Sequence, residues 1–365
     1  MIDPGTPSLT VGLLARFSPA ALERTLGAIA SQLTRADELL VVPLAGLTEP
    51  DETAVRVEES RIVGGVSKRI ALLSGSGPGV VLDRSAAVVP ASSPAVAFNA
   101  VLAAASGEVV AFLDDGVVPV PGWLESLRFA FRNPGTDAVA GALDRQPDPY
   151  EKTRRPGGRL RWTGHLAGDF TALRGGVTSL VPPVNFALRR ARVLEAGGFD
   201  TGFTAAWPLV EVELLVRLGK GGSRFRYLPS ARAVSSRPER ALHARSGSTA
   251  GDSGTDSGFD RSAIDESAGG HTDDEPAGGP AAELEQRIAV LRSLAAVFAR
   301  HESWAVPIMF ASQLLQAVIE VAARRLPPEA PGHLSAAIRE GLRLGGRPAA
   351  GTSAGMADRT GKENG

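Results

Sequence analysis

Apolar residues in the first 145 positions alternate between short continuous runs and longer stretches with helical spacing. The continuous runs predict buried strands at residues 9–15, 38–42, 69–73, 79–83, 109–113 and 138–143. Apolar residues three or four positions apart predict helices at residues 18–33, 51–60, 93–105 and 121–131. Strands that alternate with helices in this way predict an α/β domain with a mostly parallel sheet, a Rossmann-like arrangement flanked by helices.

The apolar run at 109–113 stops at two adjacent carboxylates, Asp114 and Asp115, which are followed by Gly116. Ligands of parallel sheets bind beyond the carboxyl ends of the strands, and hard divalent cations prefer oxygen ligands. The pair therefore predicts a cation that bridges to a phosphorylated ligand. A solvated turn that merely ends a strand is the alternative, and these residues alone do not separate the two.

Composition narrows the classes of function. The 365 residues are 43% hydrophobic, which is enough for a sizeable core, and the net charge of −1 gives no overall basic excess for nucleic acid. There is no cysteine, so disulfides and thiolate metal sites are excluded. The five histidines are scattered without ligand spacing, which argues against zinc. The first residues, MIDPGTPS, lack the features of a signal peptide, so we expect a cytoplasmic protein.

The composition changes after residue 240. Residues 246–280 hold eight acidic side chains and one arginine among Gly, Ser and Ala, which predicts a disordered acidic linker. Residues 282–301 show helical periodicity, and 304–321 are apolar but interrupted by Pro307 and three polar side chains. We therefore expect four parts: a main domain (1–240), the linker (241–281), a helical tail (282–345) and a disordered C-terminus (346–365).

The helical tail has two interpretations. It is too interrupted to span a bilayer, which takes about 20 mostly apolar residues. Its helices could lie on a membrane surface, which would make the protein peripheral at the inner face of the plasma membrane. They could equally pack on the main domain.

Four segments in order resemble the family 2 inverting glycosyltransferases of GT-A fold. They are residues 112–116 with Pro119 and 121–124 (FLDDG, P, PGWL), 158–164 (GRLRWTG), 185–190 with 197–200 (NFALRR, GGFD), and 211–218 with 227–229 (EVELLVRL, YLP). The likeness covers about residues 8–235 and is closest to members that build bacterial polysaccharides of the cell envelope.

The resemblance implies a nucleotide-sugar donor, a glycan acceptor that is a polysaccharide or lipid-linked, and a divalent metal, Mg²⁺ or Mn²⁺. It assigns Glu211 as the general base. It places Asp114 and Asp115 at the metal and diphosphate, and Asp114, Asn99 and Asn185 against the donor. This chemistry needs a cation because the leaving diphosphate gains charge, and a base because a hydroxyl is a poor nucleophile.

The chain departs from the family pattern at six places around this one site. They are Val42-Pro43-Leu44 for VVDxxS, Phe98 for an arginine, Gly116 for the last motif aspartate, Val210-Glu211 for Glu-Asp, Ser235 for a late histidine, and Pro183-Val184 for Gly-Ala. Loss of several charge-assisted bonds, each worth roughly 1.5–3 kcal/mol, would weaken donor and metal binding by orders of magnitude. Two functions therefore stay open: a glycosyltransferase with altered donor recognition and a weakened or absent metal, or a catalytically silent GT-A domain that acts as a scaffold or partner in glycan assembly.

Overall fold

The structure is a computed structural model that describes residues 6–16, 19–34, 36–44, 69–73, 80–81, 91–147, 150–202, 209–235, 280–301, 311, 315 and 329–345. The helix expected at 51–60, most of the acidic linker, most of the apolar segment 304–321 and the C-terminus after residue 345 lie outside the described residues. The predictions for these segments stay predictions.

The described strands form one ten-stranded sheet and one separate hairpin. The order in the sheet is β10-β12-β7-β11-β5-β1-β2-β3-β4, with β6 paired to β12. Their bounds are β1 Leu9–Ala15, β2 Glu38–Pro43, β3 Arg69–Leu73, β4 Val80–Val81, β5 Val109–Asp114, β6 Val117–Pro119, β7 Ala138–Leu143, β10 Gly176–Thr178, β11 Asn185–Arg189 and β12 Phe225–Ser235. The hairpin consists of β8, Glu151–Leu160, and β9, Leu166–Asp169.

Strands β1, β2, β3, β5, β7 and β12 run in one direction, and β4, β6, β10 and β11 oppose them. The predicted mostly parallel α/β sheet is thereby confirmed. Asp114 is the last residue of β5, as predicted, and β5 pairs directly with β1. The carboxyl ends of these two strands therefore bring Asp114, Asp115 and the residue that follows β1 to one edge of the sheet.

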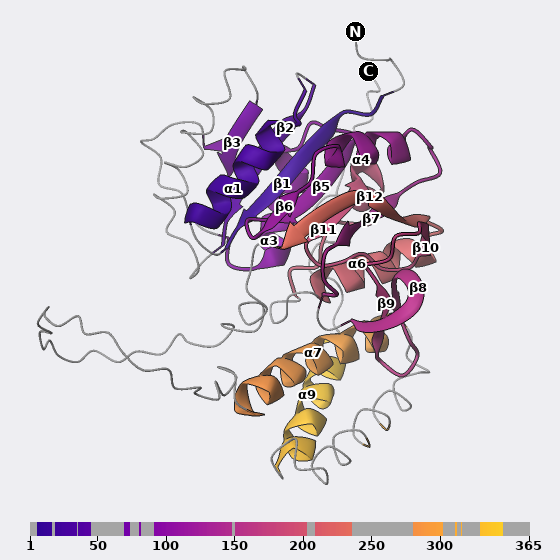
Figure 1. Cartoon of the computed structure of the whole chain (residues 1–365). Coiled ribbons are helices and arrows are strands. Elements are labelled where there is room, and N and C mark those ends of the chain that lie inside the picture. Colours follow the sequence, from indigo (N-terminus) through magenta and orange to yellow (C-terminus); the bar gives the residue numbers. More distant parts are fainter. Residues whose placement is uncertain are drawn as a thin grey trace, which may run out of the picture.

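Helices cover both faces of the sheet (Figure 1). Helices α1, Pro19–Ala30, and α4, Trp123–Phe131, bury their apolar side chains on one face. Helices α3, Pro94–Ala104, α5, Arg190–Glu195, and α6, Leu209–Lys220, contribute to the core on the other face. Burial of these apolar stripes on both sides explains why the central strands are apolar without alternation.

Two details differ from the sequence prediction. Strand β6 resumes pairing directly after Gly116, and Pro119 is tolerated because it is the last paired residue. Helix α4 begins at Trp123 and not at Pro121, because Gly122 has a φ of 86° and precedes the helix in a left-handed conformation.

The tail helices α7, Pro280–His301, and α9, Ala330–Gly345, pack against each other, and α7 also contacts α6 (Figure 1). Leu294 and Phe298 of α7 and Leu334 of α9 are buried in the same core as α6. Of the two interpretations, packing on the main domain therefore describes α7, and α9 packs on α7. No described helix is both long and apolar enough to cross a membrane. Membrane contact through the rest of the tail stays a prediction.

Candidate active site

The two carboxylates after β5 are buried and are held by the residue that follows β1. Asp114 and Asp115 are 1% and 0% exposed. The Arg16 guanidinium lies 3.1 Å from Asp114 Oδ2, and the Arg16 backbone N–H donates to Asp115 Oδ2 at 3.0 Å. Thr25 of α1 donates its hydroxyl to the Asp115 carbonyl at 2.8 Å. The motif is therefore locked to β1 and α1 and does not end in a solvated turn.

Glu211, the residue assigned as the base, lies near the same carboxylates. It sits in the first turn of α6 and is 1% exposed, and neither carboxylate oxygen has a hydrogen-bond partner among the described residues. Burial raises the pKa of Glu211 well above its ordinary value; the negative charge of Asp114 raises it further, while its own backbone N–H and Arg16 oppose the rise. Glu211, Asp114 and Arg16 are thus close enough to interact electrostatically.

Tyr150 borders this group from the start of the β8–β9 hairpin. Its hydroxyl donates to the Val181 carbonyl at 3.1 Å in the protein interior. Its pKa is raised well above the ordinary value, first by burial and then by the charge of Glu211. The patterns along the sequence did not indicate a role for Arg16, Thr25 or Tyr150. Arg16 is the first residue after β1, and only the pairing of β1 with β5 shows that it meets Asp114.

The two asparagines expected to touch the donor are engaged with protein atoms. Asn185 is 1% exposed; its amide nitrogen donates to the Ala142 and Ala231 carbonyls at 2.9 and 3.0 Å, and its oxygen accepts from Trp123 Nε1 at 2.9 Å. Asn99 donates to the Phe199 carbonyl at 2.8 Å and accepts from the Phe199 N–H at 2.9 Å. These bonds join strands and loops, so donor contacts by either residue stay predictions.

Phe98, which replaces the family arginine, belongs to the core. Its ring stacks on Phe199 with centroids 4.6 Å apart and meets the edge of Phe112 at 4.7 Å. It is 1% exposed and fills the space between α3, β5 and the loop after α5. A cation is therefore absent from this position of α3, whereas Arg16 brings one to the same sheet edge from β1.

The described residues do not fit a complete divalent cation site. Asp114 already binds the Arg16 guanidinium, Asp115 binds the Arg16 N–H, and Gly116 offers no side-chain ligand. Among the described residues, no three His, Asp or Glu side chains are grouped so that they could hold a metal ion. The available ligand side chains therefore provide at most part of the Mg²⁺ or Mn²⁺ site that the sequence resemblance implies.

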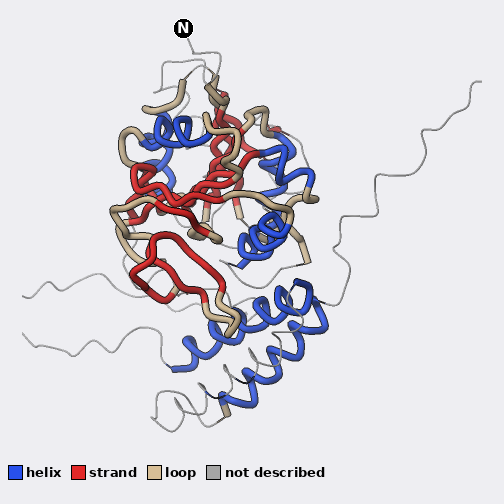
Figure 2. The backbone as a smooth tube through the Cα atoms, turned by 90° about the vertical axis from the view of Figure 1, so that its right-hand side faces the viewer, coloured by secondary structure: helices blue, strands red, loops and turns tan. Residues whose placement is uncertain are grey.

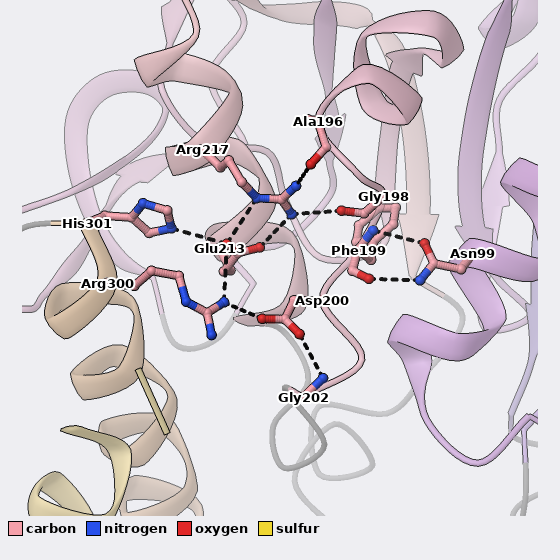
Figure 3. Close-up of polar contacts among 10 residues, drawn as sticks. All are labelled: Asn99, Ala196, Gly198, Phe199, Asp200, Gly202, Glu213, Arg217, Arg300 and His301. Atoms are coloured by element: carbon pink, nitrogen blue, oxygen red, sulfur yellow. Dashed lines mark hydrogen bonds and ion pairs between the residues drawn. The ribbon is translucent and has the colours of Figure 1, made fainter. Parts of the chain in front are cut away.

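A second polar cluster holds the loop before α6 and the end of α7 (Figure 3). The Arg217 guanidinium donates to the Gly198 carbonyl at 2.7 Å, to the Ala196 carbonyl, and to both carboxylate oxygens of Glu213. Gly197 and Gly198 have φ values of 87° and 76°, so this pair forms a tight turn that residues with a Cβ atom would adopt only under strain. The turn carries the carbonyls that Arg217 binds.

Glu213 is the centre of this cluster. It lies two residues after Glu211 on α6, is 1% exposed, and accepts from His301 Nε2 at 3.1 Å. Arg300 of α7 lies 3.7 Å from Glu213 and also forms an ion pair with Asp200 in the turn before α6 (Figure 3). The end of α7 is thus tied to the helix that carries the candidate base.

We expect a Glu213→Gln variant to change how acid unfolds the protein. Burial alone would raise the pKa of Glu213, but hydrogen bonds from His301 and Arg217 lower it to about 2. A carboxylate whose pKa is lowered by folding stabilises the fold at any pH above its pKa in the unfolded chain. This contribution is lost as pH falls from about 4.5 toward 2. Urea unfolding should show wild type losing more stability than Glu213→Gln across that interval. Equal losses of unfolding free energy in the two proteins would mean that the contacts of Glu213 with His301 and Arg217 do not stabilise the fold.

A mixed sheet with paired carboxylates after its central strand places the chain among α/β proteins that bind ligands at the carboxyl edge of the sheet. Residues 91–197 match the family model described as glycosyl transferase family 2. This match covers Asn99, Asp114, Asp115 and Asn185, and it ends before Glu211. The resemblance to family 2 glycosyltransferases is therefore confirmed for this part of the chain.

Two curated relatives, both from Mycobacterium tuberculosis strains, share 32% identity with the chain over 138 residues. Each is named pre-mycofactocin glycosyltransferase, and the alignment covers 38% of this chain and 29% of the relative. The chain thus spans less than a third of the length of these relatives.

Solved structures of glycosyltransferases resemble the chain at a lower level. The mannosyltransferase PcManGT of Pyrobaculum calidifontis, with GDP-mannose and Mn²⁺, is 16% identical; the match covers 93% of this chain and 87% of that one, with a TM-score of 0.48. Glucosyl-3-phosphoglycerate synthase of Mycobacterium tuberculosis, with Mg²⁺ and UDP, is 19% identical over 65% and 75%, with a TM-score of 0.43. At these values neither structure supports an inference about ligands of this chain.

Proposed function

We propose that this protein transfers a sugar from a nucleotide-sugar donor to a hydroxyl group of a glycan acceptor, either a polysaccharide or a lipid-linked glycan. The observation that supports this most directly is the buried Glu211 carboxylate beside Asp114 and Arg16 at the carboxyl edge of the sheet. Together with the family match over residues 91–197, this group offers a base and a diphosphate-facing cation at one place.

In the proposed reaction, Glu211 takes the proton of the acceptor hydroxyl while the oxygen attacks the anomeric carbon of the sugar. The new bond joins the acceptor oxygen to that carbon, and the bond to the diphosphate oxygen breaks on the opposite side. The nucleoside diphosphate leaves with the electron pair of the broken bond, and the anomeric configuration is inverted. Tyr150 stays neutral beside this base, because burial and the charge of Glu211 raise the pKa of its hydroxyl.

We further propose that Arg16 faces the donor diphosphate and supplies positive charge that the reduced metal site does not. The support is its ion pair with Asp114 and the replacement of the family arginine by the buried Phe98. Guanidinium groups bind phosphate oxygens in a two-pronged geometry without needing a metal. Donor binding should therefore depend only weakly on Mn²⁺.

This proposal predicts the behaviour of an Arg16→Gln variant. Loss of charge-assisted bonds worth about 1.5–3 kcal/mol should weaken binding of the preferred nucleoside diphosphate by roughly 10- to 100-fold. Thermal shift against a panel of nucleoside diphosphates and nucleotide sugars, with Mn²⁺ or with EDTA, would first identify that ligand in wild type and then measure the variant. Arg132→Gln, on the exposed end of α4, is the matched control.

A second function, a catalytically silent GT-A domain that serves as a scaffold in glycan assembly, is favoured by one observation. Arg16 already forms an ion pair with the buried Asp114, so this carboxylate has a partner without any ligand at that place. A wild-type protein that shows no thermal shift with any member of the panel, and no sugar transfer, would support this second function. Stabilisation by a nucleoside diphosphate that is lost in Arg16→Gln would support the enzyme.

A further inference from the structure

One side of the molecule carries a large local excess of positive charge. Residues 150–180, which include the β8–β9 hairpin and β10, hold six lysines or arginines and two carboxylates. Residues 219–232, from the end of α6 through β12, hold four cations and no carboxylate. These two segments therefore carry an excess of eight positive charges in a chain whose net charge is −1. Such a separation of charge produces a strong local field.

The two segments form one continuous surface, because β10 lies between them. Strand β10 pairs with β12 in the sheet and contacts β8 of the hairpin. Arg155, Arg159 and Arg174 line one groove on this surface, and Val177 of β10 lies on its rim. Val177 also borders a second groove of about 710 Å³, which Arg161, Arg224 and Arg226 line. Figure 2 shows the hairpin standing away from the main sheet, beside the tail helices.

The cations on this surface crowd one another. The pKa of Arg159 is lowered from its ordinary value, first by burial and then by the charges of Arg155 and Arg161. Two carboxylates in the hairpin offset part of this charge: Glu151 lies 2.7 Å from the His165 ring and 3.9 Å from Arg161, and Asp169 is the other. An external anionic partner would relieve the repulsion among these arginines.

Large apolar side chains are exposed among the same cations. Trp162 is 57% exposed at the turn of the hairpin, Leu173 is 82% exposed shortly before β10, and Val177 is 86% exposed within β10. They are three of the seven large apolar side chains that are exposed in the described part of the chain. A soluble polyanion such as a nucleic acid or a polyphosphate offers no acyl chains in which the two aliphatic side chains could be buried.

We propose that this surface, formed by the β8–β9 hairpin, β10 and the start of β12, docks on a bilayer that contains anionic phospholipids. Lysine and arginine near an anionic leaflet are attracted to it within a Debye length. Tryptophan and aliphatic side chains that project beyond the cations enter the interface between headgroups and acyl chains. The proposal places the contact on the main domain and not on the tail helices. It does not depend on the proposed transfer activity, because docking needs no chemistry.

Co-sedimentation of the full chain with vesicles tests the proposal. We expect binding to vesicles of phosphatidylglycerol and phosphatidylcholine at low salt, much weaker binding to pure phosphatidylcholine, and loss of binding in high salt. Arg155→Glu combined with Arg174→Glu should lower the partition coefficient by about 25-fold or more, since each basic residue near an anionic surface contributes roughly a fivefold factor. Both side chains are exposed, so the fold should be retained.

The control makes the same charge change on the other face of the sheet. Arg24→Glu combined with Arg132→Glu reverses two exposed arginines, one on α1 and one directly after α4, and it should leave binding unchanged. An equal loss in this control would reduce the effect to overall charge and overturn the proposal. Unchanged binding in the Arg155/Arg174 variant would also overturn it and direct attention to the tail.

The apolar part of the contact has its own measurement. Phospholipids brominated near the headgroup should quench tryptophan fluorescence of the wild-type protein, and this quenching should be largely lost in Trp162→Phe, which keeps the apolar contact. Quenching that persists in the variant would show that another tryptophan enters the bilayer. Binding to RNA or polyphosphate that matches binding to vesicles, together with no quenching, would replace the bilayer by a soluble polyanion.

Discussion

Replacing Glu211 with glutamine should lower sugar transfer by roughly 10²- to 10⁴-fold, because the amide keeps the size of the side chain but cannot accept the acceptor proton. The buried position of Glu211 and its place beside Asp114 and Arg16 are the reasons for this expectation. The measurement is the turnover rate with the donor found by thermal shift. A variant as active as wild type would move the base to another residue.

The pH dependence separates a base from a merely structural carboxyl group. Burial raises the pKa of Glu211, so the protonated form is held in the folded protein and the basic form gains as pH rises. Transfer by wild type should therefore increase with pH, while the residual activity of Glu211→Gln should not follow that curve.

The stability of the fold should depend on pH in the opposite direction: the ionisation of Glu211 that favours transfer should lower the free energy of unfolding. A raised pKa contributes stability that is complete below about pH 4.5 and is lost as pH rises through the folded-state pKa. Glu211→Gln should thus match wild type in acid and be more stable than wild type at pH 8. Equal stability at both values would mean that burial of this carboxylate does not oppose folding.

Replacing Asn185 with leucine should destabilise the fold by about 4 kcal/mol, since it leaves three buried polar groups without partners. Its amide joins β11 to carbonyls of β7 and β12 and accepts from Trp123 of α4. Urea unfolding measures the loss, and Asn133→Ala, which removes one exposed hydrogen bond from the Gly135 N–H, should cost no more than about 1 kcal/mol. A small effect from Asn185→Leu would favour its role as a donor contact over its role in the core.

Hydrophobic patterning predicted the strands well because each central strand is buried on both faces and is therefore apolar without interruption. It also placed Asp114 at the carboxyl edge, since the apolar run ends there. Hydrophobic patterning could not reveal that Asn185 faces the interior. The residue type is the same whether an asparagine binds a donor or three groups of the protein. The space for its amide depends on Gly141, where a Cβ atom would lie 2.4 Å from the Asn185 nitrogen.

The replacements around the site show a second limit of the sequence. Phe98 looks like the loss of a phosphate contact, yet its ring completes an aromatic cluster with Phe112 and Phe199. Arg16 looks like an ordinary residue after a strand until the pairing of β1 with β5 brings it to Asp114. Patterns along the chain report which side chains are present, but strand order decides which of them meet.

The link between α6 and α7 has a thermodynamic consequence. Glu211 and Glu213 lie on the same turn of α6, and Glu213 is bound by Arg300 and His301 at the end of α7. If a molecule that engages the tail changes the affinity for a donor by some factor, the donor must change the affinity for that molecule by the same factor. Donor binding at the sugar-nucleotide site and ligand binding at the C-terminal helices would then be coupled, and a measurement of either one would report on the other.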